Sequence, residues 1–434
     1  MIGARRLRRH AAGTAAALCA VLGTGAAMAQ YVDPATPTYS GYPAEPKNLE
    51  GGDSVTEDLS QDDVDVGGVL AFPKVEAFFQ PFFDWKKRLN DRTGLQLQFS
   101  YQTLYQTTND DDALYSDAFA GRAQVQGSWS LLNRGGANPG KLTFRIENRY
   151  TIDSEIPPSQ FGYQFGSVTP SGTGFSDFGS ALTELAWRQT LADGKFKFIL
   201  GKISAISWYN VHALSSSMRG FQNTGLQSSL SKPAPGRGIG GGFGYEFSPK
   251  FVLVAGIHDA NAKTPDDPFD TIGEGEFYRS VEFRYYPTTP DRWRYDQVRL
   301  QFWQQDALSE SGTPADQGVT ISASRLFEDR YFVFGFGGMS EGKATLFEAD
   351  AAAGFGIAFD TRHRAARDAL GIGIAWGRPS NDRLQEQYTG EMFYRFQLVD
   401  RVALTPSIQY VKHPAANPNG EDVVIFGLRT RITF

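Results

Sequence analysis

The chain has 434 residues, of which 48 are acidic and 42 are basic, so its net charge is −6. An acidic balance argues against nucleic acid as a partner. The mean hydropathy is −0.34, although 13% of the residues are aromatic and 47 are glycine. This combination is typical of a β-barrel, in which polar residues of the lumen dilute the apolar residues that face lipid.

The N-terminus has the layout of a secretory signal peptide, which we place at residues 1–29. Four arginines between Arg5 and Arg9 precede a small and apolar stretch, and Ala27-Met28-Ala29 forms an A-x-A cleavage site. A transmembrane anchor is the weaker interpretation, because the apolar stretch is shorter than the ~18 to 20 residues that a spanning helix needs. Cleavage would remove the four arginines, no acid and the only cysteine, Cys19, which leaves a net charge of −10 and no thiol or disulfide chemistry.

Two segments precede the region of strands. Residues 30–73 are rich in proline and then acidic, and we expect a poorly ordered periplasmic segment. Residues 74–92 carry Phe78, Phe82 and Trp85 among other aromatics at helical spacing, which predicts a short amphipathic periplasmic helix whose stripe is broken by Pro81.

After Gly94 the hydrophobic period changes to two. Leu95, Leu97 and Phe99, for example, alternate with glutamine and serine. Sixteen segments show this alternation, and each has about the ~9 to 11 residues that a tilted strand needs to cross a bilayer. We predict strands near 95–102, 122–131, 142–149, 181–191, 195–203, 238–248, 250–260, 277–287, 295–306, 317–327, 330–340, 351–360, 369–378, 388–399, 401–411 and 423–434.

The connections between these strands differ in length by parity. The even-numbered ones are mostly short, such as Ala192-Asp193-Gly194 and the single residue Asp400. The odd-numbered ones are longer: 107–118, 152–180, 204–237, 261–276, 307–316, 341–350, 379–387 and 412–422. Short turns on one rim and long loops on the other are typical of bacterial outer-membrane barrels. The sequence therefore predicts an all-β fold: a closed, 16-stranded, antiparallel transmembrane β-barrel over residues 93–434, in the outer membrane.

A barrel of sixteen strands leaves an aqueous channel, so we looked for charged residues on the inward face of the strands. Opposed arginine and glutamate side chains supply donors and acceptors while nearly cancelling in charge, which suits neutral polyhydroxylated solutes. For any single residue, ordinary polarity of the wall is the competing interpretation. The candidates for lining or constricting the pore are Arg145, Glu147, Arg149, Glu184, Arg188, Lys202, Trp208, Arg219, Glu282 and Arg284.

The third long loop, 204–237, is the longest and contains aromatic residues. We expect a loop of this length and composition to pack against the rest of the protein. We expect it to fold inward and narrow the pore, with Trp208 stacking on sugar rings, and a flap on the surface is the alternative.

Other patterns carry less information. Gly236 to Gly241 matches G-x-G-x-x-G but leads into a strand, which contradicts a dinucleotide site. The four histidines after the signal peptide are scattered without metal-ligand spacing, and His258-Asp259 is better explained as a turn at a strand end than as part of a catalytic site. The run Asn109 to Asp112 does not have the spacing of a calcium loop. We therefore predict no catalytic residues, no metal and no cofactor.

Several stretches resemble the carbohydrate-selective porins of the OprB type. They include Leu182-Thr183-Glu184-Leu185, Tyr388-Thr389-Gly390-Glu391 and the closing run from Leu404-Thr405-Pro406 to Phe434. The resemblance extends over about residues 75–434. It implies an outer-membrane porin that admits glucose and related sugars by diffusion, with a charged constriction formed by inward residues. The third loop lacks the asparagine-rich segment common in the family, and the acidic extension is longer than the family pattern, so the preferred sugar stays open.

The sequence thus favours a passive, sugar-selective channel. The alternatives are a general diffusion porin, a plugged structural barrel and a barrel enzyme that acts on lipid. The expected partners are sugars, outer-membrane lipid and lipopolysaccharide, and the barrel-assembly machinery, while a monomer and a homotrimer both stay open. That machinery is expected to recognise the terminal aromatic residue, Phe434.

Overall fold

The computed structural model describes residues 30–31, 49, 51–62, 68, 70–71, 73–110, 113–288, 292–328, 330–358 and 368–434. The expected signal peptide lies outside the described residues.

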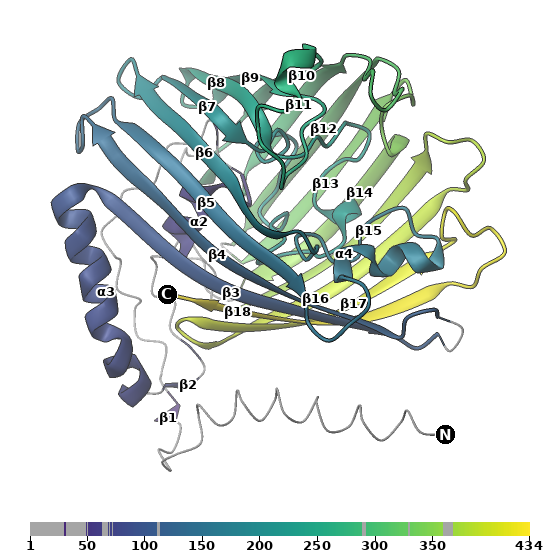
Figure 1. The fold of residues 1–434 in the computed structure, drawn as a ribbon, viewed down its shortest axis with the longest axis horizontal. Helices are drawn as coiled ribbons and strands as arrows, with labels where there is room; N and C mark the ends of the chain where they lie inside the picture. The colour runs from purple at the N-terminus through teal and green to yellow at the C-terminus, as the bar shows by residue number, and fades with distance from the viewer. Residues whose placement is uncertain are drawn as a thin grey trace.

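Sixteen antiparallel strands, β3 to β18, form a closed barrel in which β18 pairs with β3 (Figure 1). The strands are β3 (Leu95–Thr108), β4 (Asp117–Leu132), β5 (Gly140–Thr151), β6 (Gly179–Leu191), β7 (Phe196–Ile203), β8 (Gly238–Ser248), β9 (Phe251–Asp259), β10 (Phe277–Tyr285), β11 (Gln297–Gln305), β12 (Asp316–Phe327), β13 (Tyr331–Ser340), β14 (Phe347–Ala358), β15 (Ala369–Pro379), β16 (Gln387–Val399), β17 (Val402–Lys412) and β18 (Val423–Thr433). The predicted fold is confirmed.

Each predicted strand coincides with an observed one, and the largest differences lie at strand ends. β3 continues to Thr108, beyond the end predicted near residue 102, because Thr103, Thr107 and Thr108 still pair with β18. Closure of the ladder, and not the hydrophobic pattern, keeps these polar residues in the sheet.

The two rims differ as predicted. The long connections include 152–178 and 204–237, and the opposite rim has tight turns such as Asp400-Arg401 between β16 and β17. Two connections on the tight rim are longer than the rest, 286–296 and 359–368. Tyr286 and Trp293 of the first of these are buried among apolar residues, whereas Arg292 donates to the carbonyl of Leu326 at the end of β12.

The strands present alternating faces, as expected of a barrel between lipid and lumen. On β18, Phe426 and Leu428 lie on the outer face with nearly half of their surface exposed, whereas Arg429 is buried on the inner face. The same alternation on the other strands makes the outer wall apolar and leaves charged and amide side chains inside.

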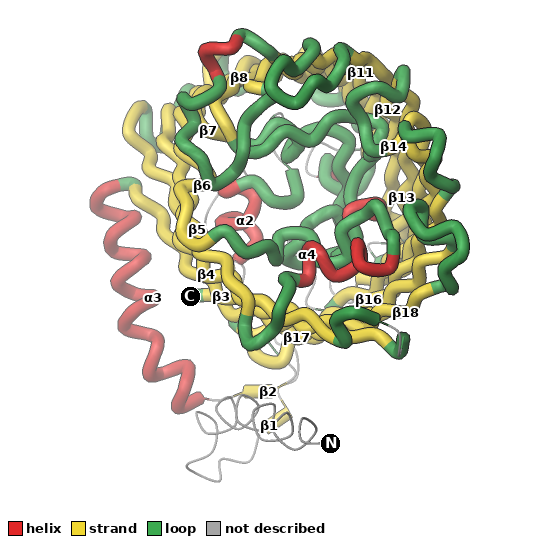
Figure 2. Tube along the Cα trace, turned by 45° about the vertical axis from the view of Figure 1, so that its right-hand side comes forward, coloured by secondary structure: helices red, strands yellow, loops and turns green. Residues whose placement is uncertain are grey.

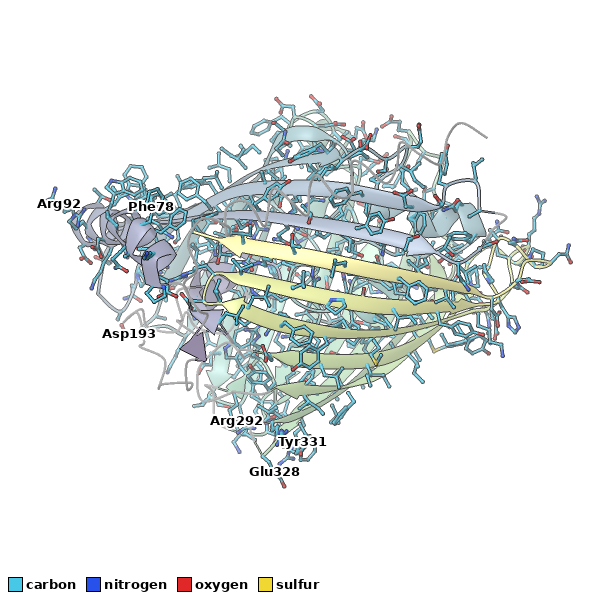
Figure 3. The ribbon with its side chains drawn as sticks, turned by 90° about the horizontal axis from the view of Figure 1, so that it is seen from below. Phe78, Arg92, Asp193, Arg292, Glu328 and Tyr331 are labelled. Atoms are coloured by element: carbon cyan, nitrogen blue, oxygen red, sulfur yellow. The ribbon has the colours of Figure 1, made fainter. Side chains whose placement is uncertain are left out.

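Two helices flank the start of the barrel on opposite sides of its wall (Figure 2). The helix α3 (Pro73–Thr93) lies outside, where the ring of Phe82 is 5.8 Å from that of Phe99. It continues through Pro81, contrary to the expected break, because a proline in a helix removes only one backbone donor and packing on the barrel compensates. Phe78 projects from this helix and is 77% exposed (Figure 3).

The helix α2 (Val55–Asp62) lies inside the ring of strands, against β4 and β5. We expected residues 30–73 to be poorly ordered, and the structure departs from this expectation over residues 51–62. Within this N-terminal part, β1 (Gln30–Tyr31) also pairs with β2 (Leu70–Ala71).

None of the helices that the structure describes is long and apolar enough to cross a membrane.

The C-terminal residue belongs to the seam that closes the barrel. The backbone of Phe434 donates to Phe99 at 2.8 Å and accepts from it at 3.1 Å, and its ring is 5.4 Å from that of Phe79 on α3. We predict that deletion of Phe434 lowers the yield of inserted barrel far more than it alters the conductance of the barrels that do insert. Heat-modifiable migration on gels measures the yield, and normal insertion of the deletion variant would contradict the role of Phe434 in assembly.

Candidate functional site

The third long loop lies inside the barrel. Asn210 N donates to Glu282 Oε2 at 2.8 Å, and Gln222 N donates to Glu391 Oε1 at 2.8 Å. Both glutamates belong to inward faces of strands, so the loop 204–237 is tied to opposite parts of the inner wall. The expected inward fold is what the structure shows, and the surface flap is wrong.

A second loop, 152–178, also reaches the inner wall, which the sequence analysis did not predict. It contains α4 (Pro158–Phe161), and the carbonyl of Ser171 accepts bonds from Gln106 at 2.8 Å and from Gln409 at 2.7 Å. Its length and its buried aromatic residues are the same signals that drew attention to the third loop.

A third segment in the lumen comes from before the barrel. Residues 51–62 enter between the third loop and the wall formed by β4 and β5. Ser54 begins α2, because its Oγ accepts a hydrogen bond from Glu57 N at 3.3 Å. Serine followed three residues later by glutamate is a capping signature, so this helix could have been found in the sequence.

One cluster of predicted charges lies on β4 and β5. Glu147 is fully buried and forms ion pairs with Arg122 and with Arg149, the latter at 2.6 Å. Arg149 and Glu147 were predicted as pore-lining residues, whereas Arg122 was not. Arg122, Glu147 and Arg149 all lie on the inward faces of the adjacent strands β4 and β5. The alternation of apolar and polar residues along β4 was therefore sufficient to place Arg122 in the lumen.

Arg145 and Arg219 are brought together by a residue that the sequence analysis missed. Asp58 of α2 accepts from Arg145 Nη2 at 2.8 Å and from Arg219 Nη1 at 2.6 Å. Arg145 also donates to Gln126 Oε1 and to the carbonyl of Asp53. A carboxylate of the N-terminal segment therefore bridges the barrel wall and the third loop.

Asp53 completes this contact. Its carboxylate accepts from Ser216 Oγ at 2.7 Å and from Ser217 Oγ at 2.9 Å. Burial by itself would raise the pKa of Asp53, but the hydrogen bond from Ser216 and the charges of Arg122 and Arg145 outweigh it and hold the pKa below its usual range.

Glu184 reaches the lumen through a β-bulge in β6. The register with β5 shifts so that Arg145 faces Glu184 and Ile146 faces Leu182, which leaves Thr183 as the extra residue. The Glu184 carboxylate accepts from Thr143 Oγ1 at 2.9 Å and lies 3.8 Å from Arg188 Nη2.

Glu184 also lies 3.8 Å from Nη1 of Arg237, a further residue that was not predicted. The predicted residue Lys202 does not join this group, since its Nζ donates to the carbonyl of Asp266 in the loop after β9.

A second cluster lies across the barrel on β10 and β11. Arg284 Nε binds Glu282 Oε1 at 2.6 Å, and Arg284 and Arg299 both donate to the carbonyl of Trp208, at 2.6 and 2.7 Å. Glu282 and Arg284 thus anchor the third loop to the wall.

The expectation that Trp208 stacks on sugars is not met in this structure. Its indole is 1% exposed, and its ring centre lies 5.4 Å from that of His258. A Cβ on Gly242 would lie 2.6 Å from the indole, so the glycine-rich run of β8 makes room for Trp208 against the wall. The glycine-rich run at Gly236 to Gly241, which resembled a nucleotide-binding loop, and the adjacent Gly242 therefore belong to a part of the wall where the absence of side chains leaves room for packing.

The lumen therefore combines many hydrogen-bond donors and acceptors with charges that are paired. Arginine forks and carboxylates that are held by partners can exchange hydrogen bonds with a solute that both donates and accepts. The apolar outer wall, the closed sheet and the polar interior define an outer-membrane β-barrel.

The comparison with protein families agrees with this class. Residues 313–434, which include β12 to β18, match the family model described as "Carbohydrate-selective porin, OprB family". Over these residues, the resemblance drawn from the sequence is confirmed. A search of curated proteins finds no match.

Two solved structures of OprB from Pseudomonas putida are similar in fold. The structure at high pH is 14% identical, covers 81% of this chain and 97% of its own, and superposes with a TM-score of 0.64. The structure at low pH is 13% identical, covers 82% of this chain and 97% of its own, and has a TM-score of 0.50. At these identities the likeness establishes the fold alone.

We predict that Glu147→Gln destabilises the barrel by about 3 to 5 kcal/mol, because it leaves Arg122 and Arg149 buried without their shared counter-charge. The matched control is Glu310→Gln, since Glu310 pairs with Lys263 on the exposed surface and exposed pairs contribute at most about 1 kcal/mol. Denaturant unfolding in detergent measures both changes. Equal stabilities of the two variants would show that the Glu147 cluster is not a stabilising element.

Proposed function

We propose that this protein is an outer-membrane channel for the passive, selective diffusion of carbohydrates, such as glucose and related mono- and oligosaccharides, into the periplasm. The family match of residues 313–434 supports the class of solute. The barrel fold favours a channel over an enzyme that acts on lipid.

The observation that carries the proposal is that the acidic residues on the inner wall are paired with arginines. Glu147 lies between two arginines, and Glu282 pairs with Arg284 and lies 3.5 Å from Arg299 Nη1. A pore for simple anions would carry a ring of basic residues without acidic partners. Paired charges instead offer donors and acceptors side by side, which matches the hydroxyl groups of a sugar.

A plugged barrel remains the second candidate, and a specific observation favours it. The lumen holds two long loops and the segment 51–62, whose residues Ser54 to Leu59 are all buried. If these elements never move, the protein does not conduct. We also propose contacts with lipopolysaccharide, the barrel-assembly machinery and further copies of the chain, on the grounds of the barrel class alone.

The proposal predicts that the purified protein, reconstituted in planar bilayers, forms channels whose ion current is blocked in a saturable manner by glucose or maltose. A sugar that binds the paired charges occupies the path of the ions, so block follows binding. An open channel that no sugar blocks would identify a general diffusion porin. The absence of any current from full-length protein and from the variants described below would identify a structural barrel.

A further inference from the structure

The N-terminal segment occupies the path that a solute would take. Of its residues, Gly51 and those from Ser54 to Leu59 are buried. The helix α2 lies inside the ring of strands (Figure 2), and the contacts of the segment place it between the wall of β4 and β5 and the third loop.

The segment is held at three places. Asp58 binds the wall through Arg145 and the third loop through Arg219. Glu57 forms an ion pair at 2.6 Å with Arg294, which lies in the turn 286–296 between β10 and β11. Each anchor is a charged pair between different parts of the chain, so the position of the segment is specific.

The apolar residue Leu49 provides a further contact with that turn. It is buried in a cluster that includes Trp208, Tyr286 and Trp293. The turn 286–296 is long for its rim, and it supplies both Arg294 for Glu57 and the aromatic residues around Leu49.

The N-terminal segment also packs closely against the third loop. A Cβ added to Gly51 would lie 1.5 Å from the carbonyl oxygen of Ser207, and one added to Gly52 would lie 2.9 Å from Ser215 Oγ. The backbone of the segment therefore touches the third loop without intervening side chains.

The barrel does not need the segment to stay closed. Each of the sixteen strands pairs only with its two neighbours in the barrel, and α2 has eight residues, fewer than a helix needs to be stable by itself in water. The segment can therefore leave the lumen without breaking the sheet, and outside the lumen it has no reason to remain helical.

Departure of the segment would leave arginines without their counter-charges. Arg145 and Arg219 would lose Asp58, and the group would lose the nearby charge of Asp53. In addition, Arg122 Nε and Nη1 are buried and have no hydrogen-bond acceptor in the described part of the chain. Guanidinium groups that have lost a carboxylate partner favour another carboxylate as the replacement acceptor, because its two oxygens match their donor geometry.

We propose that the segment from Leu49 to Asp62 is a tethered, displaceable plug, and that Asp58, with Asp53 beside it, occupies a carboxylate-binding site formed by Arg145 and Arg219, with Arg122 nearby. When the plug leaves, a sugar that carries a carboxylate takes this site. The inference rests on the proposed function as a carbohydrate channel and names the class of sugar that the arginines prefer.

A disulfide tests whether the plug moves. The Gly52→Cys, Ser215→Cys double variant joins the segment to the third loop, since the distance of 2.9 Å from the Gly52 Cβ to Ser215 Oγ suits a disulfide. The only other cysteine, Cys19, lies in the expected signal peptide. We expect oxidised channels to be closed and a reductant to restore the conductance of the unmodified protein, while each single-cysteine variant is insensitive to the reductant. Equal conductance in the oxidised and reduced states would overturn the movement of the plug.

Displacement without a covalent bond tests the site. Gly51→Val forces its side chain into the Ser207 carbonyl and should expel the segment, whereas Gly273→Val is the matched control, because a Cβ at Gly273 meets nothing within 4 Å. We expect Gly51→Val to give a larger conductance that is shifted toward anions, and block by glucuronate at about tenfold lower concentration than by glucose, equivalent to about 1.4 kcal/mol. The control should behave as the unmodified protein.

The outcomes separate this inference from the proposed function. If Gly51→Val conducts and is blocked by glucose and glucuronate at the same concentration, the carboxylate site is wrong and the sugar channel stands. If Gly51→Val matches the control in conductance and selectivity, the plug is wrong. Asp58→Asn provides a second variant that keeps the size of the side chain and removes its charge, and it should shift selectivity in the same direction as Gly51→Val.

Discussion

Closure of the hydrogen-bond ladder is the constraint on which the rest of this structure depends. No backbone donor or acceptor can face hydrocarbon without a partner, so the sheet must end by pairing its last strand with its first. Here β18 pairs with β3 over nine residues, from Ile425 with Thr108 to Thr433 with Ser100. Phe434 extends this seam by its bonds to Phe99.

Closure with sixteen strands also leaves a wide interior that other parts of the chain must fill. A barrel of this width is too wide for its own side chains to fill. The chain brings in the loops 152–178 and 204–237 and the segment 51–62. Their backbone groups cannot all reach water, and the inward residues of the wall become their partners: Glu282 and Glu391 accept backbone N–H groups of the third loop, and Arg299 donates to a carbonyl of it.

The charged residues of the lumen therefore serve two purposes at once. A buried charge is costly unless it is paired, so each acid on the wall lies against at least one arginine or a set of donors. Glu147 and Glu184 show this on β5 and β6. The same pairing that makes the interior stable gives it the mixture of donors and acceptors that suits a sugar, so stability and selectivity arise from the same residues.

The sequence by itself determined the barrel, because lipid outside and water inside impose a period of two on every spanning strand. That period located all sixteen strands, the parity of the connections and the inward face on which Arg145, Glu147 and Glu282 lie. It could not show which inward residues meet, because partners such as Asp58 and Arg145 are far apart in the chain and belong to different elements. Trp208 illustrates the limit. Its aromatic ring on a long loop suggested a surface on which sugars stack, but the glycines of β8 and the hydrogen bonds to its carbonyl place the indole against the wall. The tertiary structure alone decided what the lumen contains, since the placement of loops and of the acidic segment depends on contacts across the barrel that no local pattern encodes.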